Sequence, residues 1–322
     1  MDFSCYLKRI PTLAELATDA YHTVINVPFS KFQECGNDFI MIDNQDRCFD
    51  ELFDEVELIR KMCERRFGIG ADGLIVLSKH KDVDFEVTCY ASDGRPASVC
   101  ADGSRCVLAF GAYTGLYDED TEAVFLTPGG THRGSQLELG RDLYRVQLND
   151  VDTILVYNRD HYFIRSSSLQ HVTFIDSEPS ARQVLEMGKT IRNSNNYRKQ
   201  EAANVVFVRI IDDNTITIRT YDWRGEKEAL SSGSAAVAAA IGTQLRCSAG
   251  ETSINISYTA KSCTQNVITL GGELQISFTI MRPTGQINPK TIVSNISLVG
   301  PATQVYHGVF KWKLKNYKCY QV

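Results

Sequence analysis

The alternation of hydrophobic and polar positions predicts a chain built mostly of β-strands with a few helices. Runs of β-branched and aromatic residues predict strands, and apolar positions that recur every three or four residues predict helices. We predict strands at residues 39–43, 74–77, 85–90, 135–138, 144–148, 153–157, 205–209 and 215–221. We predict helices at residues 13–23, 51–65 and 180–191, a helix that opens near residue 99, and an alanine-rich helix at 234–241.

The Thr-Pro-Gly-Gly turn at residues 127–130 is the clearest break in this pattern, because proline and glycine interrupt both helices and strands. Mostly strands, one long helix and one shorter helix occur on each side of it. Such a weak internal repeat favours a duplication over a single doubly wound sheet. The sequence therefore predicts two similar α+β halves that face each other, with a small-molecule site at their interface.

The composition restricts the classes of function. The chain has 322 residues, 43% of them hydrophobic and 23% charged, which is ordinary for a soluble globular protein. The net charge of -5 and the lack of a basic run argue against binding to nucleic acid, so we expect a small-molecule partner. No apolar run is long enough for a membrane helix, and the N-terminal residues lack the apolar core of a signal peptide. We therefore expect a cytoplasmic protein without a membrane partner, in which the ten cysteines are reduced thiols.

Two segments of the sequence look like copies of one motif. The first runs from Asp93 to Arg105 and contains Cys100, and the second runs from Arg224 to Ala235 and contains Ser232. In both, a charged turn with glycine leads into small residues and then into an apolar helical run. The first N–H groups of a helix have no partner within the helix, so each helix start can bind an anion. The pair of motifs therefore predicts one anion held between two helix starts, with a proton carrier on each side.

Cofactor-free proton removal from the α-carbon of an amino acid needs a base on one face, an acid on the other and a fixed carboxylate. Helix N-termini provide dipoles for the carboxylate and lower the pKa of a nearby thiol. Cys100 fits this environment and is a candidate catalytic residue. Ser232 has other interpretations, because a hydroxyl at a helix start is most often an N-cap and is a far weaker acid than a thiol. Ser232 is therefore a proton carrier, a cap, or a replacement for cysteine in an inactivated variant, and the sequence leaves these open.

The chain resembles the diaminopimelate epimerases, a family of amino-acid racemases and epimerases that use no cofactor. The resemblance covers roughly residues 28–312 and rests on several motifs in a fixed order. These motifs are Gly36–Phe39, Arg65–Gly73, Cys100–Cys106, Asn158 before His161, Asn204–Val208, Arg224–Ser234 and the segment from Gly300 to Gly308.

This resemblance implies a two-domain α+β fold. Each of two pseudo-symmetric domains would be a curved, mostly antiparallel sheet wrapped around a central helix, with the active site in the cleft between them. The implied limits are an N-terminal extension at 1–27, a first domain at 28–126 completed by a strand at about 298–312, a second domain at 127–297 and a tail at 313–322.

The resemblance also implies a role for each matching position. Cys100 and Ser232 fall on the two catalytic thiols, which act as base and acid on opposite faces of the α-carbon. The positions implied to contact the α-carboxylate are Ala101, Asp102, Gly233 and Ser234, and Gly103 is implied to be substrate-binding as well. The positions implied to contact the rest of the substrate, mostly its distal end, are Asn37, Asn158, Asn204, Trp223 and Arg224.

Several positions depart from the family's pattern. Ala91 replaces a substrate-binding asparagine, and Trp223 replaces the glutamate that binds the α-ammonium, for which Asp222 is a substitute after a shift of one residue. Gly73 and the Ala101–Asp102 pair differ as well. Because tryptophan can stack on a flat or cationic group, we expect a polar amino acid as the substrate. Diaminopimelate and histidine, or another aromatic or basic amino acid, stay open.

Three functions stay open at this point. The leading hypothesis is a cofactor-independent amino-acid racemase or epimerase, which is an isomerase. The second is a lyase or tautomerase on the same scaffold, in which Cys100 is the one competent base. The third is a non-catalytic amino-acid-binding protein. No motif indicates a metal or an organic cofactor, and the oligomeric state stays open, with a homodimer among the options.

Overall fold

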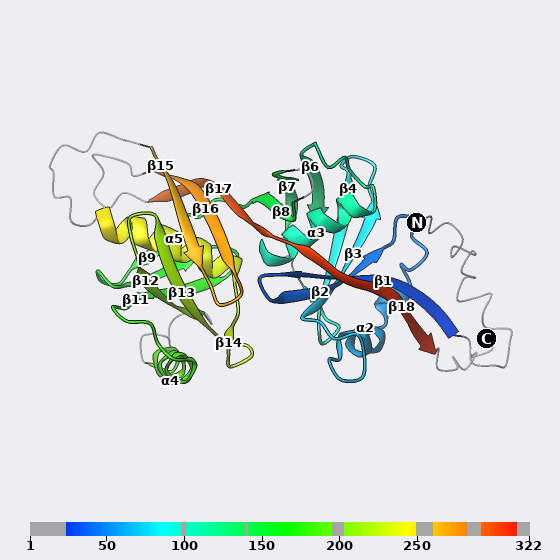
Figure 1. Cartoon of the computed structure of the whole chain (residues 1–322), viewed down its shortest axis with the longest axis horizontal. Helices are drawn as coiled ribbons and strands as arrows, with labels where there is room; N and C mark the ends of the chain where they lie inside the picture. Colours follow the sequence, from blue (N-terminus) through cyan, green and yellow to red (C-terminus); the bar gives the residue numbers. More distant parts are fainter. Residues whose placement is uncertain are drawn as a thin grey trace, which may run out of the picture.

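The computed structural model describes residues 24–97, 101–138, 141–194, 203–248, 260–281 and 291–313. It contains two lobes that lie side by side, one around helix α3 (Ala101–Tyr113) and one around helix α5 (Gly233–Ser248) (Figure 1). Helices α2 (Val56–Cys63) and α4 (Ala181–Arg192) lie on the outside of the lobes. The strands are β1 (Val24–Glu34), β2 (Asn37–Asp43), β3 (Gly73–Lys79), β4 (Phe85–Ala91), β5 (Pro96–Ala97), β6 (Ala123–Thr127), β7 (Gly130–Gln136), β8 (Leu143–Gln147), β9 (Ile154–Val156), β10 (His161–Arg165), β11 (Leu169–Phe174), β12 (Asn204–Ile210), β13 (Thr215–Asp222), β14 (Lys227–Ala229), β15 (Lys261–Ile268), β16 (Glu273–Met281), β17 (Ile292–Pro301) and β18 (Thr303–Lys313).

The strand pairing is the same in the two lobes. Neighbouring strands follow the order β1-β2-β3-β4-β6-β7-β8 in the first lobe and β10-β11-β12-β13-β15-β16-β17 in the second. In both orders the second and third strands are parallel, as are the fourth and fifth, and the other pairs are antiparallel. The short strands β5 and β14 attach to the fourth strand of each order, and β18 and β9 attach to the first. The predicted fold class, two pseudo-symmetric α+β units, is therefore confirmed.

Helices α3 and α5 occupy equivalent places, because each connects the fourth strand to its parallel neighbour. The sheet wraps around α5, which contacts β10 to β13 and β15 to β17. Residues 235–241 are consequently at most 1% exposed. A helix covered all round has no polar face, and alanine offers high helix propensity with little volume. The predicted alanine-rich helix is confirmed, and the structure extends it to Ser248.

Helix α4 starts with a capping box. The Gln183 N–H donates to Ser180 Oγ at 3.3 Å, and the Ser180 N–H donates to Gln183 Oε1 at 2.9 Å. Two N–H groups without helical partners are satisfied in this way. The helix predicted at 180–191 is accordingly confirmed to within one residue at each end.

The helix predicted at 51–65 is wrong in extent. A short 3-10 turn, η2 (Leu52–Asp54), comes first, and α2 starts at Val56 after an extended residue, Glu55, with φ -80° and ψ 96°. The interruption changes the direction of the chain, so Leu52 and Phe53 enter the same hydrophobic core as the buried face of α2. Apolar spacing alone does not distinguish this bent arrangement from one continuous helix.

The two lobes share a continuous path of paired strands. Strand β8 pairs with β7 on one side and with β17 on the other. Tyr144 and Val146 of β8 are buried with α3 in the first core, whereas Val151 is buried in the core around α5. Strands β7 and β8 thus pack with the first lobe, although the predicted boundary at residue 127 lies before them. The domain limits remain a prediction.

The turn between β1 and β2 contacts the second lobe. Cys35 and Gly36 have positive φ angles of 44° and 90°. Such left-handed backbone conformations allow the chain to reverse within a tight turn. A side chain at Gly36 would come within 2.6 Å of Leu230, and one at Gly271 would overlap the carbonyl oxygen of Cys35. The turn is therefore held between the segment before α5 and the β15–β16 turn, without room for further atoms.

Part of the sequence analysis concerns residues that the structure does not describe. The helix predicted at 13–23 lies outside the described residues, as does Cys100. Within the described ranges, no helix combines the length and the apolar character that crossing a membrane requires. The seven cysteines in these ranges form no disulfide, and burial raises the pKa of Cys63 to about 12.

We expect Gly271→Ala to destabilise the protein, because its methyl group must displace the carbonyl of Cys35. Overpacking of this kind costs about 1–3 kcal/mol, and urea unfolding would measure it. Gly129→Ala is the matched control, since a side chain there meets only Thr127 Oγ1 at an ordinary 3.5 Å. Equal stabilities of the two variants would show that the contact between the lobes is looser than described.

Candidate functional site

Ser232 caps the first turn of α5. The Ala235 N–H donates to Ser232 Oγ at 3.3 Å, and Ser232 Oγ lies 3.2 Å from Ser234 Oγ. The hydroxyl therefore satisfies one of the N–H groups that lack a helical partner. The cap interpretation of Ser232 is confirmed. Neither partner is a base, so among the described residues the hydroxyl has no acceptor that would take its proton at neutral pH.

Gln170 of β11 extends the site from the start of α5 into the sheet. Its Nε2 group donates to Ser234 Oγ at 3.2 Å and to Ser168 Oγ at 2.8 Å. Gln170 is fully buried and is the register partner of Asn204 on the parallel strand β12. A line of polar side chains consequently runs from the helix start across two strands.

This line continues to Trp223 and two arginines. Asn204 Oδ1 accepts a hydrogen bond from the Trp223 N–H at 3.3 Å. The guanidinium carbons of Arg192 and Arg224 lie 5.7 and 5.6 Å from the centroid of the Trp223 ring. Both distances are within the range of cation–π attraction. The indole ring of Trp223 therefore has two positively charged groups next to it. The carboxylate of Asp222 accepts a hydrogen bond from the backbone N–H of Arg224 at 3.0 Å, within its own turn.

Asn37 connects the β1–β2 turn to the start of α5. Its Nδ2 group donates to the carbonyl of Ser231 at 3.3 Å and to Glu34 Oε1 at 2.9 Å. Asn37 is therefore in contact with the residue that precedes Ser232, although Asn37 and Ser232 are far apart in the sequence. The structure thus places Asn37 beside the residue before Ser232, and its role as a substrate contact stays a prediction.

Glu34 connects the same turn to α3. Its second carboxylate oxygen forms an ion pair with Arg105 Nη2, and both side chains are 0% exposed. Arg105 Nε also donates to the carbonyl of Pro301 at 3.4 Å. Burial lowers the pKa of Arg105 to about 10, which still leaves it charged at neutral pH. The segment from Glu34 to Asn37 thus contacts the N-terminal half of α3 and the residues just before α5.

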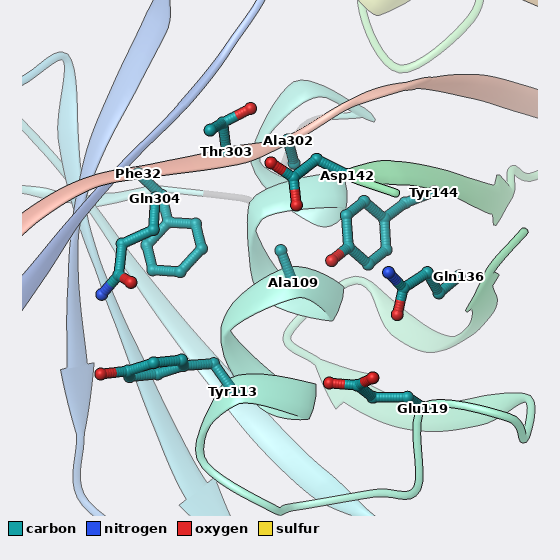
Figure 2. A pocket seen from close by; sticks show the side chains of 10 residues that line it. All are labelled: Phe32, Ala109, Tyr113, Glu119, Gln136, Asp142, Tyr144, Ala302, Thr303 and Gln304. Atoms are coloured by element: carbon teal, nitrogen blue, oxygen red, sulfur yellow. The ribbon is translucent and has the colours of Figure 1, made fainter. Parts of the chain in front are cut away.

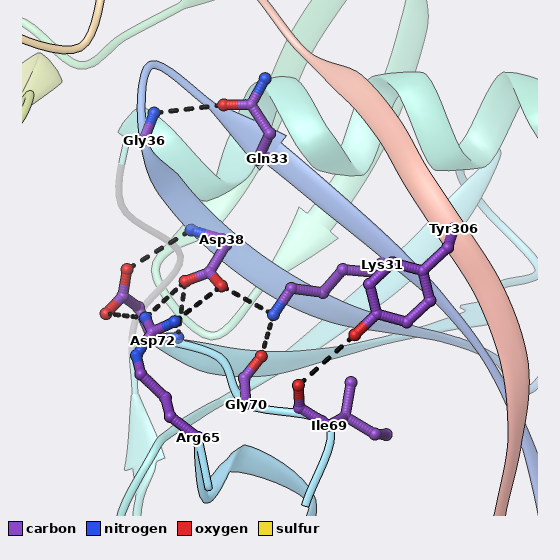
Figure 3. A network of polar contacts seen from close by, with 9 residues as sticks. All are labelled: Lys31, Gln33, Gly36, Asp38, Arg65, Ile69, Gly70, Asp72 and Tyr306. Atoms are coloured by element: carbon purple, nitrogen blue, oxygen red, sulfur yellow. Dashed lines mark hydrogen bonds and ion pairs between the residues drawn. The ribbon is translucent and has the colours of Figure 1, made fainter.

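A second ion-pair network holds the other side of this turn (Figure 3). Arg65 donates to the two oxygens of Asp38 at 2.9 and 2.6 Å and to Asp72 at 2.8 Å. Lys31, which is buried, pairs with Asp38 Oδ2 at 2.7 Å and also donates to the carbonyl of Gly70. Burial alone would raise the pKa of Asp38, but the hydrogen bonds from Arg65 and Lys31 outweigh it and lower that pKa well below its usual range. Asn37 is therefore adjacent to a fixed carboxylate.

The other predicted site residues are less closely connected. Gly103 and Gly233 are buried in the first turns of α3 and α5. Asn158 is exposed in the β9–β10 turn, where its side chain accepts the N–H of Asp160 at 2.8 Å, and among the described residues no hydrogen bond joins it to the line from Ser232 to Arg224. Cys100 lies outside the described residues, as do the side chains of Ala101 and Asp102. The opposition of Cys100 and Ser232 stays a prediction.

Four residues at the site were not singled out in the sequence: Glu34, Arg105, Gln170 and Arg192. Arg105 has a weak sequence signal, because a charged residue within an apolar helical run needs a buried partner. Gln170 has no such sequence signal, because nothing in its neighbouring residues distinguishes it from any other glutamine in a strand. In the part of the chain that the structure describes, no group of three or more His, Cys, Asp or Glu side chains is arranged to bind a metal ion.

Comparisons with known proteins match this architecture. The family model described as diaminopimelate epimerase matches residues 29–142. A diaminopimelate epimerase of Flavobacterium psychrophilum is 35% identical over 276 residues, which cover 86% of this chain and 97% of the relative. One of Chlorobaculum tepidum is 28% identical over 287 residues, with 85% and 97% covered. The crystal structure of a hydroxyproline epimerase from Agrobacterium vitis superposes with a TM-score of 0.57 over 94% of each chain at 14% identity, a likeness of fold.

We expect Arg105→Met to lose about 3–5 kcal/mol of unfolding free energy, because Glu34 would stay buried without its partner. The double variant Glu34→Gln/Arg105→Met should lose less than the single variant, and urea unfolding would give both values. Arg182→Met is the matched control, since its pair with Glu186 is exposed and worth at most about 0.5 kcal/mol. A single variant no less stable than the control would contradict a buried charge pair.

Proposed function

The chain belongs to the diaminopimelate epimerase family, and from this premise we propose that it moves the proton on the α-carbon of a polar amino acid, with Cys100 on one face and Ser232 on the other. It is an isomerase that acts on amino acids. The observation that carries the proposal is the contact of one short segment with α3, through Glu34 to Arg105, and with the residues just before α5, through Asn37 to Ser231.

The α-carboxylate is assigned to the two helix starts. A carboxylate accepts hydrogen bonds readily from N–H groups without helical partners, and the dipoles of both helices favour its charge. Gly233 is the first residue of α5, so its N–H group belongs to this helix start. The same dipoles stabilise the negative charge that develops on the carboxylate as the α-proton leaves.

The far end of the substrate is assigned to Arg192, Trp223 and Arg224. Two guanidinium groups already lie within 6 Å of the indole, at 5.7 and 5.6 Å, so a further cation there would be repelled. A distal carboxylate would instead receive several donors in a fixed arrangement. Of the substrates that the sequence leaves open, this favours an amino acid with a distal carboxylate, such as diaminopimelate, over histidine or a basic amino acid.

A second function is favoured by the cap at Ser232. Its hydroxyl accepts the Ala235 N–H, and its one other partner among the described residues is Ser234 Oγ, which supports a reaction with Cys100 as the one competent base. Cys100 would then remove a proton, and a proton shift or an elimination would follow without inversion. Such a lyase or tautomerase yields a product of altered unsaturation or mass rather than a mixture of stereoisomers.

We expect the protein to incorporate deuterium from solvent into the α-position of its substrate in both stereoisomers, with inversion slower than exchange. Ser232→Cys should accelerate inversion about 100-fold or more, because a thiol is a much better proton donor and acceptor there. NMR in deuterated water, with a chiral assay of the product, would measure both rates across a panel of polar amino acids.

Ser234→Cys is the matched control, since it places a thiol on the same helix start two residues further on, and it should give no gain. Exchange in one stereoisomer only, with an unsaturated product, would select the second function. Absence of exchange for the native protein and for Ser232→Cys alike, across the whole panel, would exclude both.

The substrate assignment predicts that Arg192→Met raises KM about tenfold for an amino acid with a distal carboxylate. The KM of the corresponding distal amide, where it is a substrate, should change little, because the amide carries no charge. Steady-state kinetics would measure both, with Arg182→Met as a control on the same helix. A native preference for basic amino acids would overturn the assignment of a distal carboxylate.

A further inference from the structure

A pocket on the far half of α3 is separate from the site described above (Figure 2). It has a volume of about 280 Å³, at the lower limit of small-molecule sites. Ala109 and Tyr113 of α3 line it, eight and twelve positions after the start of that helix. At 1.5 Å per residue, these positions are about 12 and 18 Å along the axis from the helix start that the proposed reaction uses.

The walls of this pocket are aromatic. Phe32 of β1 and Tyr144 of β8 face each other across Ala109, and Tyr113 closes the lower side (Figure 2). Phe110, a buried residue of α3, packs against both Phe32 and Tyr113, with ring-centroid distances of 5.6 and 6.3 Å. The rings are therefore held in place, and the small side chain of Ala109 leaves the space between them open.

The rim of the pocket carries two carboxylates without counter-ions. Glu119 and Asp142 lie on opposite sides of it (Figure 2), and neither makes an ion pair with a described residue. No lysine, arginine or histidine is among the residues that line the pocket. Arg141, the neighbour of Asp142, pairs instead with Glu138 at 2.9 Å. The pocket is consequently an aromatic space with uncompensated negative charge at its opening.

Two further oxygen atoms in the pocket have no partner among the described residues. Tyr144 is only 5% exposed, yet its hydroxyl, which points into the pocket in Figure 2, makes no hydrogen bond to any of them. Gln136 Oε1 is buried and likewise unsatisfied, while the amide nitrogen of this side chain donates to the carbonyl of Arg141 at 2.7 Å. Buried polar atoms are normally satisfied, so Gln136 Oε1 indicates a missing donor, and the Tyr144 hydroxyl provides a second acceptor in the same pocket.

From this arrangement we propose that the pocket binds a small organic cation, an ammonium or guanidinium group on an apolar body. All four oxygen-bearing groups, on Glu119, Asp142, Tyr144 and Gln136, can accept hydrogen bonds, and such a cation supplies several donors with a positive charge. The aromatic walls bind the apolar body and attract the charge through their faces. This site is independent of the amino-acid substrate and of the proton transfer.

Titration with phenethylamine would test the proposal, followed by calorimetry and by NMR shifts of labelled backbone amides. We expect phenethylamine to bind at least about tenfold more tightly than 2-phenylethanol, which has the same shape without the charge. The shifts should centre on Ala109, Tyr113 and Tyr144. Equal binding of the amine and the alcohol, or shifts centred on Ser232, would overturn the proposal.

Variants of the pocket separate charge from shape. Glu119→Gln/Asp142→Asn should weaken phenethylamine binding about tenfold, whereas Asp118→Asn/Asp120→Asn, which removes the same charge outside the pocket lining, should leave it unchanged. Tyr144→Phe keeps the packing of the ring and should weaken binding about threefold or more through loss of its hydroxyl. Binding unaffected by Glu119→Gln/Asp142→Asn, or weakened as much by the control pair, would show that the pocket is not the site.

Discussion

The buried ion pair between Glu34 and Arg105 is the contact on which the candidate site depends. Both side chains are fully buried, and removal of two charges from water costs several kcal/mol per ion unless each finds its partner. The pair is therefore stable only in one arrangement of the β1–β2 turn relative to α3. Because Asn37, in the same turn, contacts the carbonyl of Ser231, that arrangement also fixes the turn against the start of α5. One electrostatic constraint thus sets the relation of two helices from different lobes.

The duplicated pairing order explains why this constraint lies at the centre of the molecule. Each lobe wraps its sheet around one helix, and the start of α5 is the end of that helix that meets the first lobe. The β1–β2 turn reaches that end from the first lobe. The line from Ser234 through Gln170 to Trp223 starts there and runs through the second lobe. The two units have the same fold, and they differ in the chemistry at this junction.

Much of the fold could be predicted from local signals, and the missing parts have physical reasons. The capping box at Ser180 and the alanine-rich run of α5 are local signals, and the helices predicted at 180–191 and 234–241 are confirmed. Strand β11 was missed because all six of its residues are buried, so it has no polar face and no alternation. In strands β15 and β16 buried and exposed residues do alternate. Both strands could therefore have been predicted from the sequence, although they were not. The contacts of Glu34, Gln170 and Arg192 could not be predicted, because they depend on which segments the topology brings together.

The replacement of a thiol by a hydroxyl gives the two faces of the proposed reaction different proton chemistry. An ordinary thiol has a pKa near 8.5, so a helix start brings it within reach of neutral pH; a serine hydroxyl is a far weaker acid. Cys100 can therefore remove a proton and return it to the same face, which exchanges the α-proton without inversion. Delivery from the Ser232 face would leave an alkoxide unless the proton is replaced at once. Inversion is therefore limited by proton transfer at Ser232, which is why exchange and inversion should differ in rate.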